Sequence, residues 1–212
     1  TLVKGMKVAR VIVLGPSHYG RFRGAALPDY ALFRTPLGDV PIDTAAVEKL
    51  RANPFFSVQA EADRREHSIE VQLPFLQAAL RSFTLLPVLV GALDGDDAAK
   101  AAEALAPFAG EGTLLVASSD FTHFGARFGY TPFRRDIEAG IRTLDYGAIA
   151  PILAGAPRAF SDYIAKTGAT VCGHGPIGVL LEIMTRGRAP AGAPAVLLSY
   201  ATSGEATGAR GD

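Results

Sequence analysis

The sequence lacks several features that mark particular classes of protein. Its 212 residues include no tryptophan and one cysteine, Cys172. A single cysteine cannot form an intrachain disulfide, which excludes a disulfide-stabilised scaffold and suits a reducing compartment. Lysine plus arginine equals aspartate plus glutamate at 21 each. Because no net charge attracts a polyanion, we expect neither nucleic acid nor a membrane surface as a partner.

Long hydrophobic runs and the common catalytic motifs are also missing. No apolar stretch reaches the roughly 18 residues of a membrane-spanning helix, and the basic start TLVKGMKVAR leads directly into a strand. There is no Walker loop, no G-x-G-x-x-G and no G-x-S-x-G, so no motif supports nucleotide binding or serine-hydrolase activity. We expect a cytoplasmic protein. Since the chain opens on Thr1 and stops in a turn-rich segment, we also expect a piece of a longer protein.

What the sequence does contain is an alternation of apolar strands and helices. With 49% hydrophobic residues, the chain has ample apolar side chains for a core. The predicted buried strands lie at 8–15, 83–91, 111–119 and 193–205. Between them, helices are predicted at 44–52, 66–82, 94–110, two within 133–166, and after Cys172. This order predicts an α/β fold, a layered mixed or parallel sheet with helices on both faces.

Local signals refine three of these elements. Asp43 is expected to cap the helix over 44–52, because its carboxylate can accept from a free backbone N–H. The helix within 66–82 is expected to bend or restart near Pro74. Residues 21–43 are expected to be irregular, since prolines and a glycine are spaced too closely there for a helix.

Two of the four histidines follow predicted buried strands. His18 stands in GPSH and His123 in SSDFTH. If their strands are parallel, both histidines lie at the sheet edge where ligands bind in α/β folds. Imidazole suits metal ligation and proton transfer near neutral pH. The alternative is that each histidine only caps a turn.

Asp120 and Cys172 add further chemistry to these strand ends. Asp120 precedes His123 by three residues and could orient it and raise its basicity, although Ser119 or Asp120 could equally cap a turn. Cys172 lies among glycines before a predicted helix, whose start would favour a thiolate able to bind metal or act as a nucleophile. The alternative is a small buried hydrophobe. His67 lacks the spacing of a zinc peptidase motif and is as consistent with a pocket wall as with a buried polar contact.

Six motifs taken in order resemble the Memo family, whose bacterial members are called AmmeMemoRadiSam system protein B. They are LGPSHYG, EHSIEVQLPFL, LPVLVGAL, SSDFTHFG, TVCGHGPIGVLL and LSYATSGE. The resemblance implies one Memo-like domain over 1–212, incomplete at both ends. It also implies a fold similar to the class III extradiol ring-cleaving dioxygenases, which bind non-haem Fe(II) through two histidines and a carboxylate.

The resemblance also implies roles for individual residues. By motif, His18 and Cys172 are metal ligands, and His123 is in the acid/base position with Asp120 beside it. The implied pocket residues are His67, Ser17, Tyr19, Ser119 and Phe121. The family normally carries a third ligand in an upstream Pro-His-Ala-Gly-Tyr segment, and this sequence has no such segment. We therefore expect a divalent metal in the intact parent, Fe(II) ahead of copper, and weak or no metal in this fragment.

Three functions follow as hypotheses. The first is a metal-dependent redox or dioxygenase-like enzyme acting on an unknown small molecule or peptide. The second is a non-catalytic binding module that recognises a peptide or protein through the same pocket, with an aromatic rim of Tyr19, Phe22, Phe121 and Phe124. The third is a hydrolase with Cys172 as nucleophile and His123 as base. The resemblance adds the other proteins of the AmmeMemoRadiSam system as candidate partners.

Overall fold

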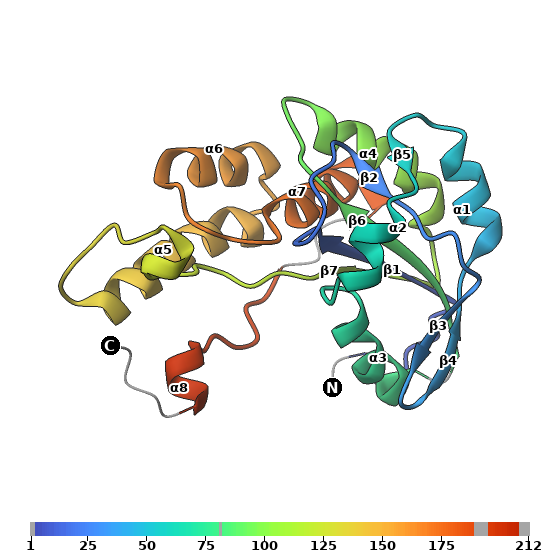
Figure 1. Ribbon diagram of the computed structural model, residues 1–212, viewed down its shortest axis with the longest axis horizontal. Helices are drawn as coiled ribbons and strands as arrows, with labels where there is room; N and C mark the ends of the chain where they lie inside the picture. The colour runs from blue at the N-terminus through green and yellow to red at the C-terminus, as the bar shows by residue number, and fades with distance from the viewer. Residues whose placement is uncertain (1–2, 81, 189–194, 208–212) are drawn as a thin grey trace.

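A central mixed sheet organises the chain. The computed structural model describes residues 3–80, 82–188 and 195–207 (Figure 1). Within them, a five-stranded sheet has the order β5-β2-β6-β1-β7. Its strands are β1 (Arg10–Pro16), β2 (Ala25–Ala26), β5 (Phe56–Ser57), β6 (Thr84–Val90) and β7 (Thr113–Ala117). β1 lies between β6 and β7 and is parallel to both, whereas β2 is antiparallel to β6. The mixed α/β fold expected from the sequence is confirmed.

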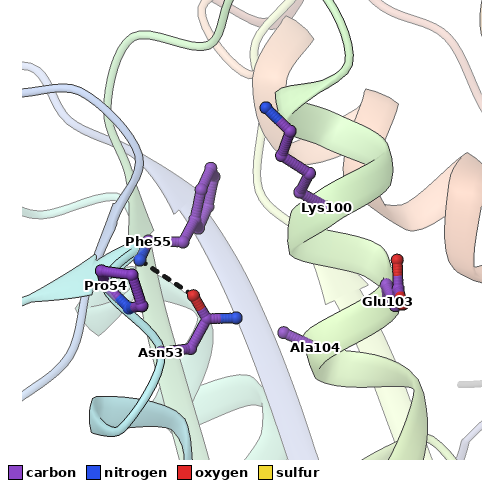
Figure 2. A pocket seen from close by; sticks show the side chains of 6 residues that line it. All are labelled: Asn53, Pro54, Phe55, Lys100, Glu103 and Ala104. Carbon is purple, nitrogen blue, oxygen red and sulfur yellow. Dashed lines mark hydrogen bonds between the residues drawn. The ribbon is translucent and has the colours of Figure 1, made fainter.

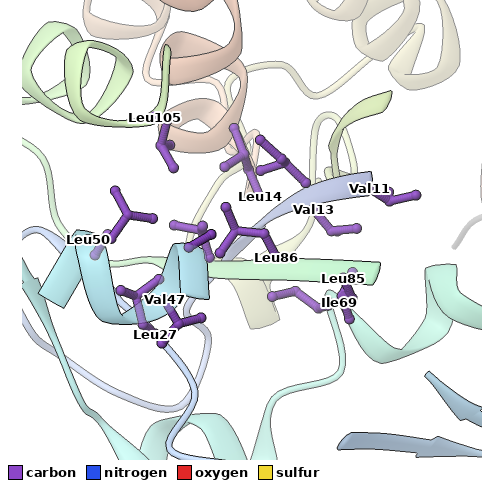
Figure 3. Close-up of a cluster of buried hydrophobic side chains, with 14 of the residues drawn as sticks. Val11, Val13, Leu14, Leu27, Val47, Leu50, Ile69, Leu85, Leu86 and Leu105 are labelled. Atoms are coloured by element: carbon purple, nitrogen blue, oxygen red, sulfur yellow. The ribbon is translucent and has the colours of Figure 1, made fainter. Parts of the chain in front are cut away.

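The two inner strands form the core. Residues 11–14 of β1 are completely buried, as the continuous apolar run predicts for a strand covered on both faces. In Figure 3, Leu14 and Leu105 lie on the α4 side of the strands, and Val47 and Ile69 lie on the other side. All four side chains belong to one buried cluster. Helices therefore cover both faces of the sheet, and burial of apolar surface stabilises the stack.

The longer helices follow the predicted order, and two short helices were not predicted. Their bounds are α1 (Thr44–Arg51), α2 (Ala60–Arg65), α3 (Leu73–Ala79), α4 (Asp97–Leu105), α5 (Ile137–Leu153), α6 (Pro157–Thr167), α7 (His174–Ile183) and α8 (Ser203–Thr207). Short 3-10 turns lie at Glu70–Gln72, Ala106–Phe108 and Ala126–Phe128, and a π-helical turn at Met184–Arg188 follows α7. The unpredicted helices are α2 and α8. Among the described residues, no helix is both long enough and apolar enough to cross a membrane.

Two local predictions are confirmed by the backbone. Asp43 Oδ1 accepts a hydrogen bond from Ala46 N at 3.0 Å and caps α1. The helix expected over 66–82 is divided: a 3-10 turn ends at Gln72, and α3 then begins at Leu73 with Pro74 in its first turn. Proline is tolerated there because the first backbone N–H groups of a helix have no intrahelical partner.

Two predicted segments differ in the structure. Residues 21–43 contain β2 and a hairpin of β3 (Leu32–Thr35) with β4 (Gly38–Pro41), because the prolines fall at the turn and at a strand end. The strand predicted over 193–205 is wrong for its described part: residues 195–202 form no strand, and α8 follows. Residues 193–194 lie outside the described residues. A strand needs a hydrogen-bonding partner as well as apolar composition, and Val196 and Leu198 are 67% and 70% exposed.

Candidate functional site

The parallel strands bring three loops to one edge of the sheet. Ser17 N donates to Val90 O, and Ser118 N donates to Leu14 O, each at 2.9 Å. The loops that follow β1, β6 and β7 therefore start side by side, as the prediction of parallel strands requires. The amino end of α7 approaches the same edge, where Gly173 N donates to Ser119 Oγ at 3.0 Å. A side chain on Gly173 would overlap Ser118 O and Ser119, so this approach requires glycine.

Asp120, His123 and Cys172 form a compact group at this edge. Each offers a ligand atom, and these three atoms lie within 4.8 Å of one another. The backbone N–H of Asp120 donates to Cys172 Sγ at 3.1 Å, and Cys172 N donates to Asp120 O at 3.3 Å. His123 Nε2 lies 3.9 Å from Asp120 Oδ2. Asp120 and Cys172, which are 52 positions apart in the sequence, are thus held together by one hydrogen bond between their main chains and one to the Cys172 sulfur.

Thr170, which the sequence analysis did not identify, holds His123 in place. His123 Nδ1 lies 2.9 Å from Thr170 O. A carbonyl oxygen only accepts, so Nδ1 carries the hydrogen and Nε2 presents a lone pair in the neutral ring. Thr170 Oγ1 accepts from His123 N and donates to His123 O, both at 2.8 Å. The one hint of this role in the sequence is that Thr170 is the first residue of the TVCG motif.

The environment of Cys172 raises the pKa of its thiol. Burial is the main effect that raises the pKa of Cys172, and the charge of Asp120 adds to it. Hydrogen bonds from Asp120 N, Ser119 and Gly173 N oppose this rise without cancelling it. The Gly173 N–H at the start of α7 thus lowers the pKa, as expected, but burial outweighs this effect and the pKa is raised overall. A bound cation would supply the missing positive charge, since metal ions deprotonate the thiols that coordinate them.

His18, Glu66 and His67 form a second group. Their ligand atoms also lie within 4.8 Å of one another, but this group shares no residue with the first. The rings of His18 and His67 stack with centroids 4.9 Å apart and planes inclined by 17°. Glu66 is buried, whereas the side chains of His18 and His67 are 32% and 52% exposed. No three-residue ligand group among the described residues contains both His18 and Cys172.

A cleft connects the His18 loop to the cysteine. It has a volume of about 590 Å³ and its walls include Ser17, Gly20, Cys172 and His174. Ser17, a predicted pocket residue, donates through Oγ to Gly20 O at 2.9 Å. His174, which the sequence analysis left outside the site, lines this cleft, with Nδ1 3.0 Å from Val171 O. The cleft is therefore lined both by the loop that carries His18 and by Cys172, the two parts of the predicted metal site.

The other predicted pocket residues have different surroundings. Tyr19 is 50% exposed and lies under the guanidinium of Arg65. Ser119 bonds to the backbone beside Cys172, as described above. Phe121 packs against the buried cluster that contains Phe160, and Phe124 stacks on Phe133 with centroids 5.1 Å apart. Phe22 packs against a third buried cluster, formed by Ala26, Ala62 and Leu89. The four aromatic residues expected to rim a binding module therefore have separate environments.

A larger hollow lies elsewhere and contains none of the predicted site residues. It measures about 670 Å³ between the turn before β5 and helix α4. Its walls are Asn53, Pro54, Phe55, Lys100, Glu103 and Ala104. Figure 2 shows the Phe55 ring and the Lys100 chain on opposite sides, with Asn53 Oδ1 accepting from Phe55 N. The volume of a hollow therefore does not identify the sheet edge that carries Asp120, His123 and Cys172.

Fold and site together define an α/β protein with a cysteine, histidine and carboxylate group at the carboxyl edge of its parallel strands. Comparison with known proteins agrees with the resemblance seen in the motifs. The profile of the family described as "Memo-like protein" matches residues 1–212. The chain belongs to this family.

Known relatives are considerably longer than this chain. Protein memo-1 homolog of Caenorhabditis elegans is 39% identical over 183 residues, which cover 82% of this chain and 52% of that protein. Protein MEMO1 of Homo sapiens and of Rattus norvegicus is 37% identical over 185 residues, covering 83% of this chain and 62% of each relative. The chain thus spans between about half and two thirds of their length.

Proposed function

We propose that this chain supplies part of a redox-active transition-metal centre at the carboxyl edge of the sheet, for use on a small organic substrate or peptide. Cys172 and His18 are the proposed ligands, and His123 with Asp120 is the proposed acid/base pair. The observation that carries the proposal is that Cys172, one of the proposed ligands, lies beside the proposed acid/base pair, with the ligand atoms of Asp120, His123 and Cys172 within 4.8 Å of one another. Fe(II) is the first candidate metal and copper the second.

The chemistry of the donor atoms fits such a metal. A thiol sulfur and imidazole nitrogens are ligands that first-row transition metals prefer, whereas Mg²⁺ and Ca²⁺ prefer oxygen. His18 Nδ1 is bonded to Glu66 Oε1 at 2.8 Å, so its Nε2 is available for ligation. When bound, the metal would supply one-electron or oxygen chemistry that no side chain here provides.

The chain's own residues would handle the protons. His123 Nε2 carries a lone pair because Nδ1 donates to Thr170 O, so this nitrogen can take a proton from a bound substrate. The carboxylate of Asp120, 3.9 Å from Nε2, would stabilise the imidazolium that results. The 590 Å³ cleft beside Cys172 offers room for a small organic molecule or for one or two peptide side chains.

Metal analysis tests the proposal directly. The full-length protein that carries this chain is purified without oxygen, and its iron and copper are measured by elemental mass spectrometry beside its Cys172→Ser and His18→Ala variants. The matched control is His174→Ala, because His174 lines the cleft but belongs to neither ligand group. We expect metal in the wild type and control and its loss in both ligand variants. A wild type that is metal-free and cannot be loaded would overturn the proposal, and capture of a peptide or protein partner would then be the next experiment.

A further inference from the structure

We infer that Glu66 is a positioning residue that holds His18 as the Nδ1–H tautomer with Nε2 directed away from the carboxylate and free to serve the site. This inference rests on the proposed function only where it concerns metal affinity. Glu66 follows the last residue of α2 and is 7% exposed, while its side chain is 3% exposed. Among the described residues its ion-pair partners are His18 and His67, and neither is a permanently charged cation.

Hydrogen bonds from the protein compensate the burial of this carboxylate. Glu66 Oε2 accepts from His18 N at 2.6 Å. Glu66 Oε1 accepts from His67 N at 2.9 Å and from Ser68 N at 3.0 Å. A buried carboxylate is costly unless its lone pairs are satisfied, and three backbone N–H groups satisfy most of them here. These backbone hydrogen bonds orient the carboxylate independently of the imidazole rings.

The fixed carboxylate then determines the state of His18. Oε1 lies 2.8 Å from His18 Nδ1, and the ionised carboxylate can only accept, so Nδ1 carries the hydrogen. Because Oε2 binds the backbone N–H of the same residue, Glu66 holds His18 at two points. Both the main chain and the ring of His18 are therefore oriented, and the lone pair of the neutral ring belongs to Nε2.

The end of β1 packs against the turn that carries Glu66, so the contact between Glu66 and His18 is held by the surrounding structure. Ser68 Oγ donates to Pro16 O at 3.0 Å, two residues before His18. Gly15 lies so close to Ser68 and Ile69 that no side chain fits between them. His67 stacks on the His18 ring, but its Nδ1 is 3.5 Å from Oε1. Of the two imidazoles, only His18 makes a short ring bond to Glu66.

The first test needs no substitution. Long-range nitrogen–proton NMR of the metal-free protein at alkaline pH, where imidazoles are neutral, reports which ring nitrogen carries hydrogen. We expect His18 as the Nδ1–H tautomer and the exposed His67 as the Nε2–H tautomer that free imidazole side chains prefer. An Nε2–H tautomer for His18 in the folded wild type would overturn the inference, whatever the metal content of the protein.

The second test compares Glu66→Gln with Glu70→Gln, an exposed glutamate four residues further on. Glutamine replaces one acceptor oxygen with an N–H donor, so it cannot accept all four hydrogen bonds. We expect Glu66→Gln to lose the Nδ1–H signature of His18 and to weaken metal binding by about 10- to 100-fold, while Glu70→Gln changes neither. Thermal unfolding of both variants identifies any general loss of fold.

The outcomes separate this inference from the proposed function. If wild type binds metal and Glu66→Gln keeps both the tautomer and the affinity, Glu66 does not position His18, although the metal centre stands. Another outcome is that wild type binds no metal, and that His18 shows the Nδ1–H signature in wild type but not in Glu66→Gln. The metal centre is then overturned and the positioning role is supported.

Discussion

Gly15 and Ser68 lie so close that a methyl carbon added to Gly15 would stand 2.5 Å from the Ser68 hydroxyl oxygen. The same carbon would stand 2.7 Å from Ile69 Cγ1. The apolar run of β1 therefore ends in glycine because the turn that carries Glu66 packs directly on the strand end. We expect Gly15→Ala to lower the free energy of unfolding by about 1–3 kcal/mol, measured by urea denaturation, since overpacking displaces the turn.

Gly110→Ala is the matched control for this substitution. A methyl carbon at Gly110 would meet nothing within 4 Å, so its effect should stay within about 0.5 kcal/mol. Equal stability changes in the two variants would show that Gly15 is not closely packed.

Thr170 offers a test of how His123 is held. Valine has nearly the same shape but cannot exchange hydrogen bonds with His123 N and His123 O. We expect Thr170→Val to cost about 1–3 kcal/mol of stability, because it leaves partly buried backbone groups unpaired. We also expect broadened His123 ring signals in NMR spectra, since the ring loses its main-chain anchor.

The control for Thr170 is Thr143→Val on α5. The exposed Thr143 hydroxyl donates to Ala139 O within its own helix, so its loss should cost less than about 0.5 kcal/mol. A Thr170→Val protein as stable as this control, with sharp His123 signals, would contradict the anchoring role.

Asp97 predicts a pH dependence of stability. Burial acts to raise the pKa of Asp97, but hydrogen bonds from Asp94 N and Lys100 and the charge of Arg23 outweigh it, so its pKa is lowered overall. A carboxyl whose pKa is lower in the folded state contributes stability above its unfolded pKa of about 3.9 and loses it as the pH falls further. The stability difference between wild type and Asp97→Asn should therefore be large near neutral pH and shrink below about pH 4.

Urea denaturation at several pH values measures this difference. The exposed neighbour Asp96 supplies the control Asp96→Asn, whose difference from wild type should vary less with pH. A difference for Asp97→Asn that stays constant down to about pH 3 would show that Asp97 has an ordinary pKa in the folded protein.

Cys172 predicts slow thiol alkylation in the metal-free chain. Burial, assisted by the charge of Asp120, raises the pKa of Cys172, and only the thiolate reacts. Since Cys172 is the only cysteine, incorporation of iodoacetamide followed by mass spectrometry reports on this residue alone. The rate should still be rising above about pH 8.5, the ordinary cysteine value.

Asp120→Asn should speed this alkylation near neutral pH, because removing the negative charge lowers the pKa of the thiol. Asp162→Asn, an exposed position on α6, is the control and should leave the rate unchanged. A pH profile that reaches its plateau below the ordinary cysteine pKa would contradict the predicted direction.

Local chemistry made part of the fold predictable from the residues. The continuous apolar composition of 11–14 predicts a strand covered on both faces, and the structure buries it completely. Asp43 and Pro74 predict a cap and a helix restart, because capping and proline act over a few residues. The strand predicted over 193–205 was wrong in its described part, since apolar composition cannot supply the neighbouring strand that pairing requires.

The candidate site likewise combines residues that were predictable from their local sequence with residues that act through distant contacts. His18, His123, Asp120 and Cys172 were found from residue type and from their places after apolar segments. Glu66 and Thr170 act through hydrogen bonds across 48 and 47 positions, and such bonds leave no periodicity in the sequence.

The sequence by itself determined that the apolar run of β1 is buried, which residues carry reactive groups and which family the motifs resemble. Tertiary structure alone decided that β1 lies between β6 and β7, that Cys172 faces Asp120 and His123, and that His18 pairs with Glu66. The physical reason is that burial and turn chemistry depend on each residue and its close neighbours. Strand order and side-chain contacts depend on how the whole chain packs, because each contact is formed by segments that meet only after folding.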